Sequence, residues 1–277
     1  MRACEGDLAG ALALFREVID DATAAHDAVL RVYPLIMEGI GLAYTGETSR
    51  AQHVADSVLR GPVELGEYQA GAGHAIRAIA HLAAGDAAAA WQEWEAGLKR
   101  TGLHRASAGM YVWAALAPLA CGDLAAARRW ADDVVSAAKG SYLSSALAAR
   151  AHVNIAQGRR AEAGRDAEDA LTSAASMPDH LGLPHLFQCL AALASVAGSH
   201  VEAARLAGVA DAIRQRMGAV RFKILDADHD ALVAALREAL GHKAFDTAWA
   251  EGAALSTNEA IGYARRAHTE RTRPFAG

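Results

Sequence analysis

The sequence is short of several residue types, and each shortage excludes a class of protein. Its 277 residues hold only three cysteines, Cys4, Cys121 and Cys189, too few and too scattered for a disulfide framework, so we expect reduced thiols. No apolar run approaches the roughly 18 residues that a membrane-spanning helix needs. The first ten residues, MRACEGDLAG, are unlike a signal peptide. We therefore expect a soluble, cytoplasmic chain with no membrane contact.

Aromatic residues and alternating β-branched segments are also scarce, which makes strands unexpected. Only 6% of the residues are aromatic, whereas 53% are hydrophobic, and alanine dominates that fraction. Alanine has the highest helix propensity and lets helices pack closely. The net charge of −5, with no run of like charge, argues against a general nucleic-acid surface. The composition predicts an all-α chain that does not itself bind nucleic acid.

A repeated glycine is the strongest pattern in the chain. Six glycines stand 40, 39, 37, 36 and 40 residues apart, and each is followed five residues later by alanine. A period of this size indicates stacked helical hairpins. The glycine supplies the left-handed residue that ends a helix, and Asp86 and Asp123 are placed to cap the helix that follows. The six glycines are Gly6, Gly46, Gly85, Gly122, Gly158 and Gly198.

The residue seven positions before each of the last five glycines is always small. One small residue on each helix of a pair is what close antiparallel packing requires. These residues are Gly39, Ala78, Ala115, Ala151 and Ala191. The predicted pairs are Ala28–Tyr44 with Glu47–Leu59, Ala70–Ala84 with Ala87–Arg100, Ala108–Cys121 with Leu124–Lys139, Ser144–Gln157 with Ala161–Ala174, and Pro184–Ala197 with Val201–Gln215. Pro34 is expected near the first turn of its helix, where a missing N–H is tolerated.

One helix, from Gly6 to about Asp21, has no predicted partner before it. Either the sequence begins in the middle of a repeat or this helix is a lone cap, and we favour the first. With the turn glycine as the fifteenth residue, the small residues fall eighth and twentieth, which resembles the tetratricopeptide repeat (TPR). An aromatic fourth residue occurs only at Tyr111 and Phe187, and the period exceeds 34 residues. We therefore expect a TPR-like α-solenoid over residues 1–215.

The pattern changes after residue 215. Residues 219–226 are expected to be an irregular link, and residues 216–268 to form a helical cap. Gly241 should end a helix over Asp228–Leu240, and Ser256 with Glu259 resembles a capping box that opens a last helix over Thr257–His268. Residues 269–277 are expected to be a linker.

This last segment resembles one family. The strings Glu202-Ala203-Ala204-Arg205-Leu206-Ala207-Gly208, Leu236-Arg237-Glu238-Ala239-Leu240-Gly241, Ala248-Trp249-Ala250-Glu251-Gly252 and Arg273-Pro274-Phe275-Ala276-Gly277 are similar to the helical region of large ATP-binding LuxR-type transcriptional regulators and their cyclase-linked relatives. The resemblance implies that the ATP-binding module precedes Met1 and that a helix-turn-helix follows Gly277. It also implies a regulatory role without catalysis for these residues.

No motif in the chain predicts catalysis, a cofactor or a metal. Neither a P-loop nor a Gly-x-Gly-x-x-Gly fingerprint occurs. His180, His185 and Cys189 could offer metal ligands, but we favour buried packing for Cys189. Four further groups are expected to be ordinary packing, capping or solvated positions: His74 with His81; Ser141, Ser144 and Ser145, as helix caps; Asp132 with Asp133; and Asp226, Asp228 and Asp230.

What remains is the concave surface that first helices line in such repeats. A largely apolar groove there would suit an amphipathic helix of a protein partner or an apolar effector. The candidates are Tyr33, Ile36, Ile40, Val112, Leu116, His152, Ile155, His185 and Gln188. The alternative, which we favour, is that these side chains pack against neighbouring repeats.

Three functions stay open at this point. The chain is expected to be the regulatory or sensor scaffold of a LuxR-type regulator, and a homo-oligomer is compatible with that role. A free-standing TPR-like adaptor is the alternative, and an enzyme with an unrecognised site is the least favoured. The sequence encoded after Gly277 would separate the first two, because a helix-turn-helix there supports the regulator.

Overall fold

The computed structural model describes residues 6–61, 66–177 and 180–272, and these ranges are all-α, with no strand. The all-α part of the predicted fold class is therefore confirmed. Within these ranges no helix is long and apolar enough to cross a bilayer. The helices are α1 Leu8–Ala24, α2 Ala28–Tyr44, α3 Thr48–Leu59, α4 Gly66–Ala84, α5 Ala87–Thr101, the short 3-10 helix η2 Ala108–Met110, α6 Leu116–Ala120, α7 Leu124–Ala137, α8 Ser141–Ala156, α9 Arg160–Ser176, α10 Leu183–Val196, α11 His200–Met217, the 3-10 helix η3 Lys223–Leu225, α12 Asp226–Ala253 and α13 Thr257–Thr272.

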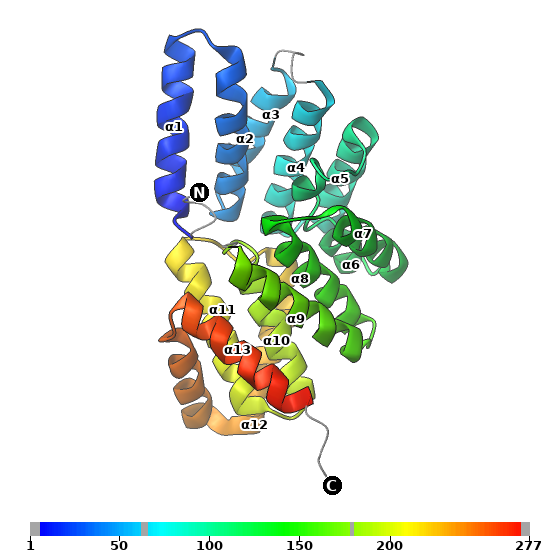
Figure 1. The fold of residues 1–277 in the computed structure, drawn as a ribbon, viewed down its shortest axis with the longest axis vertical. Coiled ribbons are helices and arrows are strands. Elements are labelled where there is room, and N and C mark those ends of the chain that lie inside the picture. Colours follow the sequence, from blue (N-terminus) through cyan, green and yellow to red (C-terminus); the bar gives the residue numbers. More distant parts are fainter. Residues whose placement is uncertain (1–5, 62–65, 178–179, 273–277) are drawn as a thin grey trace.

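Helices that follow one another in the sequence pack against one another. Extensive contacts join α2 to α3, α4 to α5, α8 to α9 and α10 to α11. Figure 1 shows α1 to α5 side by side at one end of the molecule, and α8 to α13 at the other end. We call the helix before a turn glycine the first helix of a pair and the helix after it the second helix.

The repeated glycines have the conformation that the sequence predicts. All six adopt a positive φ, between 71° and 95°, which side chains other than glycine rarely tolerate. The carboxylates of Asp86 and Asp123 then accept hydrogen bonds from the backbone N–H groups of Ala89 at 2.9 Å and Ala126 at 2.8 Å. Both predicted N-caps are confirmed, and each fixes the start of the second helix of its pair.

The small residues predicted on the two helices of each pair are all buried. Gly39 shows why they must be small. A Cβ atom placed there would lie 2.8 Å from Cδ1 of Ile76 and 3.0 Å from Cγ1 of Val54. The packing of α2 on α3 and α4 therefore leaves no room for a larger side chain at this position.

One predicted helix is wrong. Residues 108–121 form η2, a series of turns and the five-residue α6 rather than a continuous helix. Pro118 lies inside the predicted helix, where its ring would clash with the carbonyl group of Ala114 and its missing N–H would break the ladder. In addition, Met110, Tyr111, Val112 and Trp113 are all buried, and four successive residues of one helix would point in four directions.

Four further features of the helices test the predictions. Pro34 is the seventh residue of α2 and not near its first turn, so the carbonyl group of Leu30 loses its donor within the helix. Gly241, with φ 70° and ψ 161°, interrupts α12 at the predicted stop. The capping box is confirmed, because the Ser256 N–H donates to Glu259 Oε2 at 2.9 Å and the Glu259 N–H to Ser256 Oγ at 3.3 Å. The last helix continues to Thr272, into the predicted linker.

The C-terminal helices pack tightly on the repeats. A Cβ atom on Gly208 of α11 would lie 2.3 Å from the carbonyl oxygen of Trp249, and one on Gly252 of α12 would lie 1.9 Å from that of Arg205. The two backbones are therefore nearly in contact where α11 and α12 cross. Residues 216–268 are joined to α11 through main-chain approach as well as through side chains.

A polar network that the sequence analysis did not predict joins α7, α8 and α9. The guanidinium group of Arg150 donates to both carboxylate oxygens of Asp166, at 2.6 and 3.0 Å, and Asn154 Nδ2 donates to the same carboxylate at 2.8 Å. Arg128 Nη1 donates to Asn154 Oδ1 at 2.7 Å. Asp166 is buried, so this charge needs the donors that surround it.

Candidate binding surface on the first helices

The nine groove candidates all precede a turn glycine within their own helix pair, but their side chains differ in exposure to solvent. Three belong to α2, two to the turns before α6 and to α6 itself, two to α8 and two to α10. Four of them, Ile36, Val112, Leu116 and His185, are buried. Ile40, His152, Ile155 and Gln188 are partly exposed, and Tyr33, at 59% exposure, is open to solvent. The structure therefore separates the candidates into a covered group and an accessible one.

The chain's own residues 217–225, which we call the crossing segment, cover part of this surface. The segment leaves the end of α11 and runs past the first three turn glycines, Gly6, Gly46 and Gly85. Cβ atoms placed on these glycines would meet Met217 at 3.3 Å from Gly6, Val220 at 2.9 Å from Gly46, and Lys223 at 3.4 Å from Gly85. The backbone N–H of Val220 donates to the carbonyl oxygen of Tyr44 at 2.8 Å, and so caps the end of α2.

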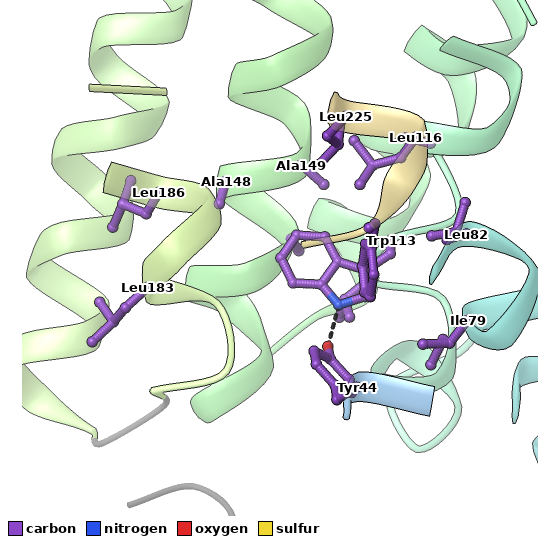
Figure 2. Close-up of a cluster of buried hydrophobic side chains, with 14 of the residues drawn as sticks. Tyr44, Ile79, Leu82, Trp113, Leu116, Ala148, Ala149, Leu183, Leu186 and Leu225 are labelled. Atoms are coloured by element: carbon purple, nitrogen blue, oxygen red, sulfur yellow. Dashed lines mark hydrogen bonds between the residues drawn. The ribbon is translucent and has the colours of Figure 1, made fainter. Parts of the chain in front are cut away.

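Phe222 anchors the crossing segment. Its ring is fully buried, with ring centres 5.5 Å from Tyr44, 5.1 Å from His185 and 6.3 Å from Trp113. The indole N–H of Trp113 donates to the hydroxyl oxygen of Tyr44 in the same cluster, as Figure 2 shows. Leu225 is buried nearby, and η3 packs on α4 and α6. An apolar groove at Leu116 and His185 is therefore already filled by this chain.

The sequence predicts only an irregular link over residues 219–226, and the role of this segment as a cover was not predicted. Val220, Phe222 and Ile224 alternate with polar residues over five positions. Such alternation indicates an extended segment with one buried face. The signal is short, and the sequence alone does not say which surface the segment would cover.

Two neutral histidines lie beneath the crossing segment. The His185 ring is 4.3 Å from the Trp113 ring and 6.3 Å from the His152 ring, measured between centres. Burial, with the charges of Arg214 and Arg221 nearby, holds the pKa of His185 well below its ordinary value. His152 as a whole is partly exposed, but its Nε2 atom is buried without a hydrogen-bond partner, and burial of the ring lowers the pKa of His152 to about 4. Both rings are uncharged at neutral pH.

Arg221 of the crossing segment forms ion pairs with aspartates on both flanking helices, α11 and α12, and Arg214 of α11 shares one of them. Arg214, buried on α11, lies 3.3 Å from Asp211, while Arg221 lies 3.5 Å from Asp211 and 3.7 Å from Asp226. Burial and the adjacent Arg221 lower the pKa of Arg214 to about 10. The cluster also includes the ring of His229 on α12, whose Nδ1 pairs with Gln188 Oε1 at 3.3 Å. The side-chain oxygen of Gln188, a partly exposed residue, therefore already has a hydrogen-bond partner within the chain.

Tyr33 is the accessible centre of the predicted surface. Val29 and Leu30, on the preceding turn of α2, are exposed beside it. Tyr68 of α4 is exposed as well, and its pKa is raised by burial and by the nearby Tyr33. These four side chains form an apolar and aromatic patch at the starts of α2 and α4. This patch is the part of the candidate surface that a partner could reach without moving the crossing segment.

The possible metal ligands are not brought together. His180 lies beside Gly6, His185 faces Trp113, and the thiol of Cys189 points to the carbonyl oxygen of Ala148 at 3.6 Å. Burial raises the pKa of Cys189 above its ordinary value, so the thiol is a poor nucleophile. Among the residues that the structure describes, no three histidine, cysteine, aspartate or glutamate side chains form a metal-binding group.

Among the other polar candidates, His74 and Ser144 have structural partners. His74 Nδ1 lies 2.7 Å from Glu93 Oε2 across the α4–α5 pair. The capping role predicted for Ser141, Ser144 and Ser145 is wrong, because Gly140 is the N-cap of α8 and no side chain caps this end of the helix. Ser144 and Ser145 are buried within the helix, and Ser144 Oγ donates to the carbonyl oxygen of Ala170 on α9 at 3.1 Å. Ser144 lies early in the helix, as expected, but its hydroxyl group donates to the facing helix α9 and does not cap the end of α8.

The chain is similar to much longer proteins. It is 43% identical over 274 residues, 98% of its length, to proteins of Mycobacterium tuberculosis (strain H37Rv) and Mycobacterium bovis that carry the provisional names HTH-type transcriptional regulator Rv0890c and Mb0914c. No family model matches the chain. The aligned region is 31% of each relative, so the chain spans about a third of the length of the regulators that it resembles.

Proposed function

We propose that this chain is a regulatory helical module of a transcriptional regulator, with no catalytic chemistry of its own. The observation that carries the proposal is the 43% identity over nearly the whole chain to proteins named HTH-type transcriptional regulators. Because those proteins are about three times as long, they have room for other modules. In keeping with the resemblance to LuxR-type regulators, these would be an ATP-binding module and a helix-turn-helix, and the whole would work in the cytoplasm.

The proposed architecture is a TPR-like α-solenoid of antiparallel hairpins over residues 1–215, with a helical cap over residues 216–268. The left-handed turn glycines and the buried small residues of successive pairs support it. In such a stack each repeat contacts only the repeats next to it. A movement at one end would therefore be passed to the other end from repeat to repeat. Such a stack suits a module that couples docking of a partner to modules on either side.

The partner or effector would bind at the patch of Val29, Leu30, Tyr33 and Tyr68. Exposed aromatic rings next to aliphatic side chains are typical of surfaces that take an amphipathic helix or an apolar effector. Figure 1 places α2 and α4 at the end of the molecule away from α12 and α13. Binding there would act on the helix pairs that the crossing segment connects to the C-terminal helices.

The module itself would not bind DNA. With a net charge of −5, it offers no broad basic surface that would release counterions from a duplex. Fluorescence anisotropy with labelled duplex DNA should show no tight binding from about 50 to about 200 mM salt. Over this range, the affinity of proteins that contact DNA phosphates falls steeply. Tight binding that weakens steeply with salt would contradict this part of the proposal.

A chimaera tests the regulatory role. The aligned 274 residues of the Mycobacterium tuberculosis relative would be replaced by this chain, and transcript profiles would be compared in cells that overexpress the intact protein, the chimaera or a version that lacks the segment. We expect the chimaera to change the same transcripts as the intact relative. A folded chimaera that behaves like the deletion would contradict the proposal and favour a free-standing adaptor.

The effector surface needs its own experiment. Thermal-shift screening of the purified chain against a metabolite library and against amphipathic helical peptides would use the wild type and Tyr33→Ala. A genuine ligand of the patch should raise the unfolding temperature of the wild type and lose most of that effect in the variant. Leu124→Ala, which changes an exposed apolar residue on α7, is the matched control and should leave the response unchanged.

A further inference from the structure

Helix α1 exposes two apolar side chains on one face. Leu14 is 42% exposed and Val18 is 36% exposed, and they are one helical turn apart. They stand eight and twelve residues after the turn glycine Gly6. The packing of α1 on α2 uses a neighbouring face, which carries the buried residues Leu8, Ala11 and Leu12.

The equivalent positions of the later second helices show what this face is for. In four of the later second helices, the side chain eight residues after the turn glycine contacts the segment that precedes that glycine, which is a first helix in three of them and the turns before α6 in the fourth. These contacts are Val54 against Gly39, Glu93 with His74, Trp130 stacked on Tyr111 at 5.9 Å between ring centres, and Asp166 with Arg150. This position therefore marks the face that meets the preceding helix.

The position twelve residues after the turn glycine is equally regular. It is buried in all five later second helices, where it is occupied by Val58, Gly97, Val134, Ala170 and Ala210. Ala170 receives the hydrogen bond of Ser144 from the first helix of its pair. Only in α1 are both positions exposed, and there they are Leu14 and Val18.

We propose that the Leu14–Val18 face of α1 is the docking surface of an amphipathic α-helix that precedes Gly6 in a longer polypeptide and runs antiparallel to α1. Gly6 has φ +88°, the turn conformation that joins the two helices in the other five pairs. The relatives extend well beyond the aligned region, which is 31% of their length, so they have further chain that could supply such a helix.

Charge favours this occupant over a second copy of the chain. Two exposed carboxylates, Glu17 and Asp21, lie beside Leu14 and Val18. The single basic residue of α1, Arg16, already pairs with Glu38 of α2 at 3.0 Å. The α1 helix of a second copy would therefore bring no free positive charge to these carboxylates. The docked helix is expected to carry a small residue opposite Leu14 and basic side chains on its flanks.

The test adds such a helix to the full chain. Residues 28–45, which include α2, would be copied and placed directly before Gly6 in place of residues 1–5. This segment is chosen because its own partner residues, Val54 and Val58, match Leu14 and Val18 in position and polarity. The reporter is Leu14→Cys in a background with Cys121→Ser, and with Cys4→Ser where residue 4 is present, labelled with a maleimide.

The fused helix should slow labelling of the cysteine at position 14 by roughly tenfold and raise the thermal unfolding midpoint, since the thiol then reacts only when the pair opens. Gly39→Arg in the copied helix is the matched control and should abolish the protection, because a side chain at Gly39 meets its partner at position eight. Hydrogen exchange of the α1 amides in fusions that keep Leu14 gives a second measurement of the same docking.

Two results would overturn the proposal. One is an equal labelling rate in the fused and unfused chains, with circular dichroism showing both to be folded. The other is protection in the unfused chain that grows with protein concentration and accompanies a dimer in light scattering. The second result would assign this face to a second copy of the chain.

Discussion

The indole N–H of Trp113 donates to the phenol oxygen of Tyr44, so the turns before α6 are fixed to the last residue of α2. Both side chains are buried, and Phe222 of the crossing segment packs on both rings. Three parts of the chain that are remote in sequence thus share one aromatic cluster. The first two predictions concern this cluster.

Tyr44→Phe should destabilise the protein, because it leaves the indole N–H of Trp113 buried without an acceptor. The expected cost is about 1–3 kcal/mol in the free energy of unfolding, measured by urea denaturation. Trp113→Phe removes the donor of the same bond. The double variant should then cost less than the sum of the two single variants. Strict additivity would show that the hydrogen bond contributes nothing.

Phe222→Ala should remove the anchor of the crossing segment. Loss of a fully buried phenylalanine costs about 3–5 kcal/mol. Phe222→Leu, which keeps an apolar side chain at the site, should cost less than about 1.5 kcal/mol with repacking. Hydrogen exchange at the end of α2 and in α11 should accelerate together in the alanine variant. Equal stabilities for the two variants would mean that the ring is not an anchor.

Stability should fall as the pH falls from about 7 to 4. The pKa values of His152, His185 and His229 are lowered in the folded state, His152 to about 4, below the ordinary value near 6.5 that the unfolded chain retains. The unfolded state therefore binds more protons in this window. Each histidine contributes a slope of about 1.4 kcal/mol per pH unit until its folded pKa is reached.

Urea denaturation at half-unit steps of pH would measure this slope. His152→Gln should reduce the slope by about 1.4 kcal/mol per pH unit, which is the contribution of one proton. The His152→Gln/His185→Asn double variant should reduce the slope further. The lowered pKa values of Asp56 and Glu93 add acid sensitivity below their ordinary range, so the comparison is made above pH 5. A flat profile between pH 7 and 5 would contradict the neutral, buried state of the histidines.

Gly252→Ala should be strongly destabilising, because the new Cβ atom would lie 1.9 Å from the carbonyl oxygen of Arg205. The clash is with backbone, so α11 and α12 must separate, at a cost of about 1–3 kcal/mol or more. Gly262→Ala is the matched control, since the nearest atom there is 3.4 Å away at the end of the Arg266 side chain. Thermal unfolding of both variants would test the close approach of the two helices.

Ala127→Trp tests the packing of a pair. Ala127 is fully buried in α7, so an indole there overpacks the helix pair by about 1–3 kcal/mol. Ala125→Trp, two residues earlier on the exposed side of the same helix, should have little effect. Similar thermal unfolding of the two variants would contradict the register of the repeat.

The turns between successive helices could be predicted because their signals are local. A left-handed residue at the end of one helix requires glycine, and an N-cap requires a short polar side chain, so Gly122 and Asp123 alone specify the turn between α6 and α7. The wrong helix over residues 108–121 also had a local signal. Pro118 lies in the interior of the predicted helix, and a proline at that position argues against a continuous helix.

The candidate surface could be predicted only in part, because its accessibility depends on residues distant in sequence. His185 and Leu116 are buried, and Phe222 and η3 pack on His185 and on α6 from a segment near the C-terminal helices. No periodicity within α6 or α10 carries information about such a cover.

The crossing segment changes how the molecule should respond to heat and force. A stack in which each pair touches only its neighbours loses structure piece by piece from its ends. Here the Val220–Tyr44 hydrogen bond and the Phe222 ring connect the early helices directly to the late ones. These contacts have a long sequence separation, which slows folding and couples distant elements. The described helices should therefore melt as one cooperative unit and not as a series of independent repeats.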